Sequence, residues 1–162
     1  MRGFLIMALS ALMMACAPTA TSAPADGPVT MTLTRSICFG FCPDYTVSID
    51  QDGVVRYEGR RFVNVTGVQQ SQVSAAEVQA LLARFDAVDF MSLRDEYRSP
   101  VSDMPTYTLT LTRNGRTKTV IDYAGTGAGM PQAVRDLEAE IDRVANTAQW
   151  VLRNGEPVRG QR

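Results

Sequence analysis

Cys38 and Cys42 are the two residues best suited to chemistry, and they are separated by three residues in the segment Cys38-Phe39-Gly40-Phe41-Cys42-Pro43. Gly40 permits the tight reversal that brings the two α-carbons within reach of a disulfide. Pro43 holds Cys42 in an extended conformation that leads into a following strand. The spacing predicts a Cys38–Cys42 disulfide, which in so short a loop contributes about 2 kcal/mol on the chain-entropy model.

A thiol–disulfide redox role for Cys38 and Cys42 stays open as an alternative, because a small strained loop is easily reduced. The spacing differs from the two intervening residues of thioredoxin-like motifs, and no helix start follows that would lower a thiol pKa. A zinc site would need two further ligands, and the chain has no histidine and three cysteines in all. We therefore expect neither a metal nor a cofactor.

The absence of histidine excludes Ser-His-Asp and Cys-His nucleophilic catalysis and the usual proton shuttle at neutral pH. The remaining candidate acid and base groups are Glu58, Asp103 and Asp122, which could pair as in a carboxylate glycosidase. A chain with 17 acidic residues supplies such pairs by chance. We expect a protein that is not an enzyme.

A run of alternating glycines, Gly125-Thr126-Gly127-Ala128-Gly129, stands between a predicted strand and a predicted helix. Its spacing is not that of a dinucleotide site, and no further strand follows the helix, so we interpret it as a connector. Arg56, Arg60 and Arg61 could bind an anion together, but neighbouring positions on a strand face opposite ways. A solvated sheet edge is the preferred interpretation of these arginines.

Phe39 and Phe41 flank Gly40 within the cysteine loop. Large apolar side chains are usually buried, so we expect both rings to fill the core. The alternative is that they form an exposed binding tip beside the disulfide.

The first residues have the anatomy of an export signal: Arg2, an apolar run from Phe4 to Met14, and a closing Ala15-Cys16. The run is too short for a membrane-spanning helix. The segment ending at Cys16 resembles a bacterial lipobox, which implies a signal peptide over residues 1–15 and acyl chains such as palmitate on Cys16. An ordinary cut after Ala25, releasing a soluble protein, is the alternative.

Residues 16–28 are mostly Ala, Pro, Thr, Ser and Gly, and they predict a flexible tether. Residues 29–151 suffice for a single domain, and residues 152–162 are expected to be a disordered tail. The formal net charge is −1, so no nucleic-acid partner is expected.

Hydrophobic periodicity predicts six strands and two helices. Asp52-Gly53 and Asn114-Gly115 are hairpin signals, and Ser74 with Glu77 forms a capping box. The predicted strands cover residues 29–35, 45–50, 54–58, 61–68, 107–112 and 117–123. The predicted helices cover residues 75–86 and a segment from Pro131 through Ala148. Trp150 is expected to pack near the end of the second helix. The order ββββαββα predicts an α+β fold with two layers, a mainly antiparallel sheet carrying both helices on one face.

The motif Cys38-Phe39-Gly40-Phe41-Cys42-Pro43, together with Tyr57-Glu58-Gly59, Asn114-Gly115 and Asp122-Tyr123, resembles a bacterial family defined only as a domain of unknown function, the 6438 family. The resemblance covers about residues 29–150. It implies a small exported or lipid-anchored protein and carries no activity onto any residue.

These observations lead to one functional expectation. The chain is expected to be exported and anchored through lipid on Cys16 to a bacterial membrane, facing the periplasm. Ala17 follows the cysteine, which by resemblance to bacterial sorting rules favours the outer membrane. The domain is expected to bind or scaffold an envelope protein or a cell-wall component.

Overall fold

The computed structural model of the chain describes residues 28–160. The predicted signal peptide of residues 1–15, the predicted lipidation site Cys16 and the tether up to residue 27 lie outside the described residues. None of the helices between residues 28 and 160 is long and apolar enough to cross a membrane.

In the described part of the chain seven strands form one sheet with the order β4-β3-β2-β1-β6-β7-β5. The strands are β1 (Thr30–Arg35), β2 (Asp44–Asp50), β3 (Val54–Arg61), β4 (Gly67–Gln72), β5 (Glu96–Arg98), β6 (Tyr107–Arg113) and β7 (Arg116–Tyr123). Every pair is antiparallel except β5 with β7 at one edge. The predicted α+β class with a mainly antiparallel sheet is therefore confirmed.

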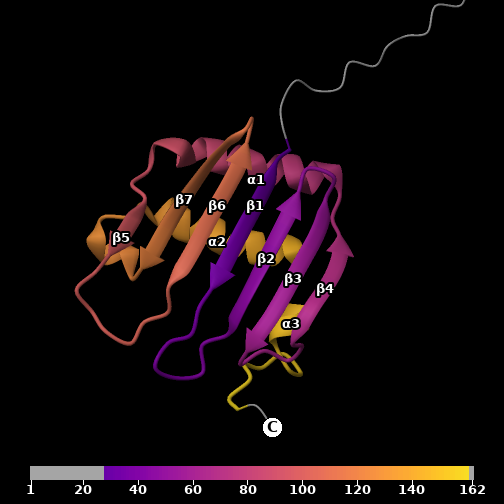
Figure 1. Ribbon diagram of the computed structural model, residues 1–162, viewed down its shortest axis with the longest axis vertical. Coiled ribbons are helices and arrows are strands. Elements are labelled where there is room, and N and C mark those ends of the chain that lie inside the picture. The colour runs from indigo at the N-terminus through magenta and orange to yellow at the C-terminus, as the bar shows by residue number, and fades with distance from the viewer. Residues whose placement is uncertain (1–27, 161–162) are drawn as a thin grey trace, which may run out of the picture.

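Helices cover one face of the sheet, and in Figure 1 they lie behind the strands. They are α1 (Ala75–Ala87), α2 (Gln132–Ala145) and α3 (Ala148–Val151), with 3₁₀ turns η1 (Phe90–Ser92) and η2 (Gly125–Ala128). The capping box of α1 forms as predicted, because Ser74 Oγ accepts from the Glu77 amide and the Glu77 carboxylate accepts from the Ser74 amide.

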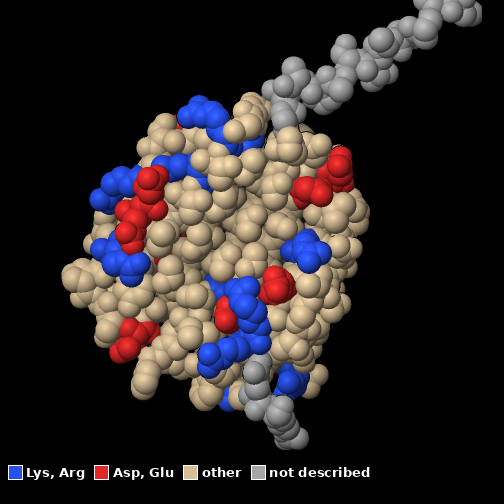
Figure 2. All heavy atoms as spheres, in the orientation of Figure 1, with Lys and Arg blue, Asp and Glu red and all other residues tan. Residues whose placement is uncertain are grey.

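Side chains alternate along each strand, so one face of the sheet is buried under the helices and the other faces solvent. On the two central strands Met31, Leu33, Leu109 and Leu111 point toward the helices and are buried. The intervening threonines form the opposite face, where cross-strand pairs such as Thr110 with Thr119 share hydrogen bonds. Figure 2 shows this open face: a central area is free of charged side chains, and Lys, Arg, Asp and Glu lie around it, at the edges and on the lower part of the face.

Both predicted hairpin turns are confirmed. Asn114 and Gly115 have φ of 54° and 69°, as a type I′ turn between β6 and β7 requires. Gly53 at the β2–β3 turn has φ of 80°. An added Cβ there would lie 2.3 Å from the Val73 carbonyl oxygen, so this turn accepts only glycine without rearrangement.

The fourth predicted strand is wrong in position, because residues 61–68 span the end of β3, a turn and only the start of β4. The apolar alternation that suggested it has another cause. Val63 is buried in this turn, and the Val65 amide donates to the Trp150 carbonyl. The actual β4 is a polar edge strand rich in glutamine, which has no apolar period to detect.

The C-terminal segment differs from the prediction in two respects. The expected last helix is two helices, because Asn146 adopts a left-handed conformation with φ of 51° that ends α2. The expected disordered tail is ordered up to Gly160, where Arg153 and Glu156 form a β-bridge and Val158 is buried. Strand β5 is the further element that the periodicity did not predict.

Candidate functional site

The disulfide between Cys38 and Cys42 closes the loop that joins β1 to β2. The two α-carbons lie 5.5 Å apart, within the range that a disulfide requires. Gly40 has φ of 154°, and its amide donates to the Cys38 carbonyl, so the chain reverses within the ring. The predicted pairing is thus present, and no helix begins in the loop between β1 and β2.

Phe39 and Phe41 project from this loop into solvent, with 88% and 55% of their surfaces exposed. The expectation that both rings fill the core is therefore wrong. The β1–β2 loop extends beyond the end of the sheet (Figure 1), so its side chains lie outside the layer where helices and strands pack. Phe41 keeps one aromatic contact, an edge-on approach to Phe62 at 5.5 Å between ring centroids.

A second loop, between β5 and β6, lies beside the disulfide loop. The Phe39 amide donates to the Asp103 carbonyl, the Ser36 amide donates to the Thr106 carbonyl, and the Thr106 amide donates to Ser36 Oγ. The two loops together carry five exposed large apolar side chains, which we call the apolar tip: Ile37, Phe39, Phe41, Val101 and Met104.

The charges beside the apolar tip are of both signs. Arg60 pairs with Asp44 at 2.7 Å and also donates to Thr46. The Arg61 guanidinium lies over the Phe62 ring at 5.5 Å. Arg60 and Arg61 therefore do not act together on one anion, in agreement with the interpretation from strand alternation.

A second group of polar residues is buried between α2 and β7. Asp122 and Glu138 are each 1% exposed, and Arg135 Nη2 lies 2.5 Å from Asp122 Oδ2. The Gly125 amide donates to Asp122 Oδ1 at 2.6 Å. Burial, together with the neighbouring charge of Asp122 and against the opposing effects of Arg135 and Arg35, raises the pKa of Glu138 to about 8. Glu138 thus holds a proton at neutral pH.

Tyr107 connects this group to a third, because its ring is contacted by the guanidinium groups of Arg35 and Arg135 at 4.3 and 4.8 Å from the ring centroid. Arg35 Nε donates to Asp142 Oδ2 at 2.8 Å, and Tyr45 Oη donates to Asp142 Oδ1 at 2.7 Å. The second and third groups join the sheet to α2, and both carboxylate oxygens of Asp142 accept hydrogen bonds.

The candidate acid–base residues do not converge. Glu58 is exposed on the open face of β3, Asp122 is buried on the opposite face of the sheet, and Asp103 stands in the β5–β6 loop. No glycosidase-like pair forms among these three residues. Asp122 does meet another carboxyl group, that of Glu138, but this pair is enclosed.

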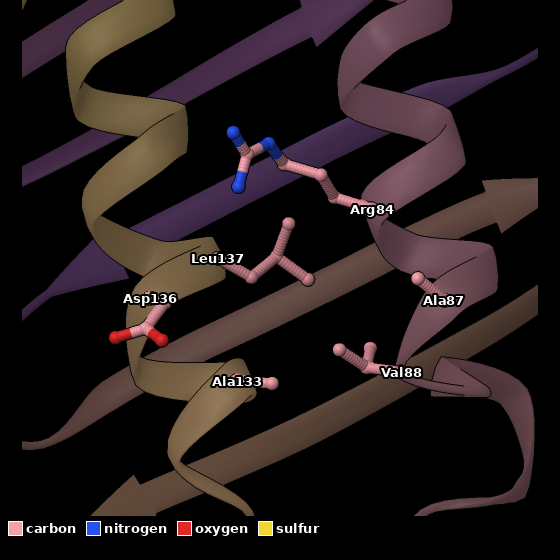
Figure 3. Close-up of a pocket in the computed structure, with 6 residues that line it drawn as sticks. All are labelled: Arg84, Ala87, Val88, Ala133, Asp136 and Leu137. Atoms are coloured by element: carbon pink, nitrogen blue, oxygen red, sulfur yellow. The ribbon is translucent and has the colours of Figure 1, made fainter.

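Two hollows lie on the helical side, and neither contains a residue of the apolar tip. The first, of about 160 Å³, lies between α1 and α2 and is lined by Arg84, Ala87, Val88, Ala133, Asp136 and Leu137 (Figure 3). It is smaller than the pockets of about 300–1,000 Å³ that hold small molecules. The second, of about 340 Å³, is an open apolar depression beside Asp142 and α3. The Asp142 carboxylate beside this depression already accepts hydrogen bonds from Arg35 and Tyr45, so it offers no free polar group to a ligand there.

The glycine run forms η2, a connector as interpreted from the sequence. Gly125 is buried, and an added Cβ would lie 2.8 Å from Asp122 Oδ1 and 2.9 Å from Tyr97 Cβ. Close packing against Asp122 therefore explains this glycine. Among residues 28–160, no three potential metal ligands gather into a site.

Glu138 is the chemically distinctive residue that the sequence reasoning missed. A signal was available, because Glu138 stands between Leu137 and Ile141 on the apolar face of α2. A glutamate at such a position predicts a buried, partnered or protonated carboxyl group.

Comparison with known proteins assigns most of this domain to a family. The model of a domain of unknown function, DUF6438, matches residues 29–145. No curated protein matches the sequence.

Proposed function

We propose that this chain, which belongs to the DUF6438 family of domains of unknown function, is a lipid-anchored protein of the bacterial cell envelope. Its domain binds or scaffolds an envelope component and catalyses no reaction. The contact surface is the apolar tip. The observation that carries the proposal is the exposure of Phe39 and Phe41 beside a disulfide at one end of the domain.

The N-terminal sequence supports the anchor. Arg2, the apolar run and Ala15-Cys16 have the order of a lipoprotein signal, with Cys16 as the acylated residue. Residues 17–28 then act as the tether between lipid and domain, and Ala17 favours the outer membrane. The membrane is the first partner, through lipid on Cys16, and the domain faces the periplasm.

The absence of histidine and the separation of Glu58, Asp103 and Asp122 support a role without catalysis. The cysteines are half-buried within a loop and do not stand at a helix N-terminus, where a thiol would become reactive. These features favour binding over chemistry.

The intact mass of the mature protein from membranes of its native host tests the anchor. We expect a chain that starts at Cys16 and carries acyl chains, with two further cysteines that react with an alkylating agent only after reduction. A soluble product that starts after Ala25 would contradict the anchor.

Photo-crosslinking in intact cells tests the contact surface. A photoreactive residue replacing Phe39 should form adducts, and the same residue replacing Val54 on the open sheet face should not. Equal adducts from both positions, or none from Phe39, would contradict the apolar tip as the contact surface.

A redox role for Cys38 and Cys42 is the alternative, favoured by the position of the disulfide in an exposed loop. It requires that a mild dithiol reduce the bond in the folded protein and that the reduced protein pass its electrons to a disulfide substrate. Resistance of the bond in the folded state ends this alternative.

A further inference from the structure

Exposed apolar surface on this domain is concentrated at one place. Within residues 28–160 seven large apolar side chains are exposed, and five of them belong to the apolar tip. The other two, Val54 and Val68, lie on β3 and β4. The tip is thus a distinct feature and not part of a generally apolar surface.

The tip is a projection and not a groove. The β1–β2 loop extends past the ends of its two strands in Figure 1, and its residues line neither of the two hollows described above. The disulfide and the hydrogen bonds from Phe39 and Ser36 to the second loop hold it in place. Little conformational entropy is therefore lost when the rings become covered.

The area of the tip distinguishes between occupants. A phenylalanine buries about 150–250 Å² when covered, so the exposed parts of Phe39 and Phe41 offer roughly 300 Å². A stable protein interface takes about 800 Å² from each partner. With the partly exposed side chains of Ile37, Val101 and Met104 added, the tip still offers less apolar area than such an interface requires. The two rings are sufficient to enter the boundary between lipid headgroups and acyl chains.

We propose that the apolar tip inserts Phe39 and Phe41 into the surface of a lipid bilayer. This inference rests on the proposed function, because it names the envelope component that the tip contacts. Arg60 is paired with Asp44, and the Arg61 guanidinium lies over the Phe62 ring, so the proposed contact is made by the apolar side chains and uses neither arginine. Binding therefore depends on the apolar rings and not on anionic lipid.

The tether is long enough for one bilayer to hold both the tip and the lipid. Strand β1 runs from Thr30 toward the tip and is about 20 Å long. Residues 17–28 can extend to about 40 Å. The inserted loop would then add a second contact with the bilayer that already holds the acyl chains of Cys16.

Vesicle flotation tests the proposal with a chain that begins at Ala17 and so carries neither signal peptide nor lipid. Every buried apolar residue of the described domain lies between Met31 and Val158, so this chain retains the whole core, and a thermal unfolding curve verifies its fold. We expect it to float with phosphatidylcholine vesicles equally at low and high salt. Phe39→Ser should weaken partitioning about tenfold, and the double variant with Phe41→Ser should weaken it further.

Val54→Ser with Val68→Ser is the matched control, because it removes the same kind of exposed apolar group elsewhere. We expect no change in flotation. A second readout uses Phe39→Trp, whose emission should shift to the blue when vesicles are added. The native Trp150 is buried and supplies a constant background.

Three outcomes would overturn the inference: absence of flotation, flotation that the phenylalanine variants do not reduce, and flotation that requires anionic lipid and low salt. If flotation fails while the crosslinker at position 39 captures a protein in cells, the bilayer is the wrong occupant and the proposed function stands. If neither experiment depends on Phe39, both the inference and the proposed contact surface fail.

Discussion

The ring of Tyr57 stacks on the indole of Trp150, with centroids 4.9 Å apart and planes inclined by 28°. Tyr57 belongs to β3 and Trp150 to α3, so this contact joins the N-terminal meander to the end of the chain. The amide of Val65 strengthens the same junction by donating to the Trp150 carbonyl at 2.8 Å. The family match ends at residue 145, but the physical domain extends past it.

Trp150→Ala should lower the free energy of unfolding by about 3–5 kcal/mol, because it removes a buried aromatic side chain and leaves a cavity against Tyr57. Urea denaturation followed by circular dichroism measures the loss. Gln149→Ala is the control, since Gln149 is exposed on the same short helix and should change little. A loss below 1 kcal/mol for Trp150→Ala would mean that α3 is an accessory to the fold.

Gly59→Ala should destabilise the domain by about 1–3 kcal/mol, the usual cost of overpacking. A Cβ at this position would lie 2.2 Å from the Val65 carbonyl oxygen and 2.5 Å from Tyr57 Oη, which donates to that same oxygen. The segment Tyr57-Glu58-Gly59 therefore has a packing explanation. Gly160→Ala, where a Cβ meets nothing within 4 Å, is the control. Equal stability of both variants would show that the β3–β4 turn shifts without cost.

Glu138→Gln should stabilise the protein at alkaline pH and flatten the dependence of stability on pH. The pKa of Glu138 is raised by burial to about 8 in the folded protein, against 4.5 as its ordinary value. Between these values the folded state binds more protons than the unfolded state, so stability falls as pH rises. Below about pH 4.5 both states hold the proton and this loss is absent.

Thermal unfolding of wild type and Glu138→Gln near pH 5 and pH 9 measures this difference, which we expect to reach a few kcal/mol at the higher pH. Asp136→Asn, an exposed carboxyl group on the same helix, should leave the slope unchanged. Parallel curves for wild type and Glu138→Gln would show that Glu138 is already ionised at neutral pH.

Replacing both cysteines, as Cys38→Ser with Cys42→Ser, should lower the free energy of unfolding by about 2 kcal/mol without loss of fold. The disulfide closes a loop outside the hydrophobic core, so the sheet retains its packing. The urea midpoint, compared with that of the disulfide-bonded wild type, measures the effect, and reduced wild type should match the double variant. Collapse of the fold in the double variant would assign the bond a larger structural role than loop closure.

The elements predicted correctly from the sequence have local causes. The Asn114-Gly115 turn, the Ser74–Glu77 capping box and the alternation of Met31 and Leu33 each act within a few residues. The disulfide follows the same logic, because its partners are close in the chain.

The parts that were missed depend on distant neighbours. Strand β5 has three residues and exists because it pairs with β7, which follows it by some twenty residues. The exposure of Phe39 could not be inferred from its residue type, because large aromatic rings are usually buried. The ring is exposed because its loop extends beyond the end of the sheet. The apolar helix face predicts that Glu138 is buried, but its position beside Asp122 of β7 depends on the fold.

The central position of β1 has a consequence for how the domain folds. Within residues 28–160 β1 is the first strand, and it pairs with β2 on one side and on the other with β6, where Thr30 lies opposite Thr112. The β1–β4 meander can form early, but one edge of β1 stays open until the C-terminal hairpin arrives. Contacts of such long sequence separation slow folding to the range of milliseconds to seconds in small domains. Until β6 pairs with β1, the exposed edge of β1 can form hydrogen bonds with a strand of another chain. Chains in which the C-terminal hairpin has not yet formed are therefore prone to aggregation.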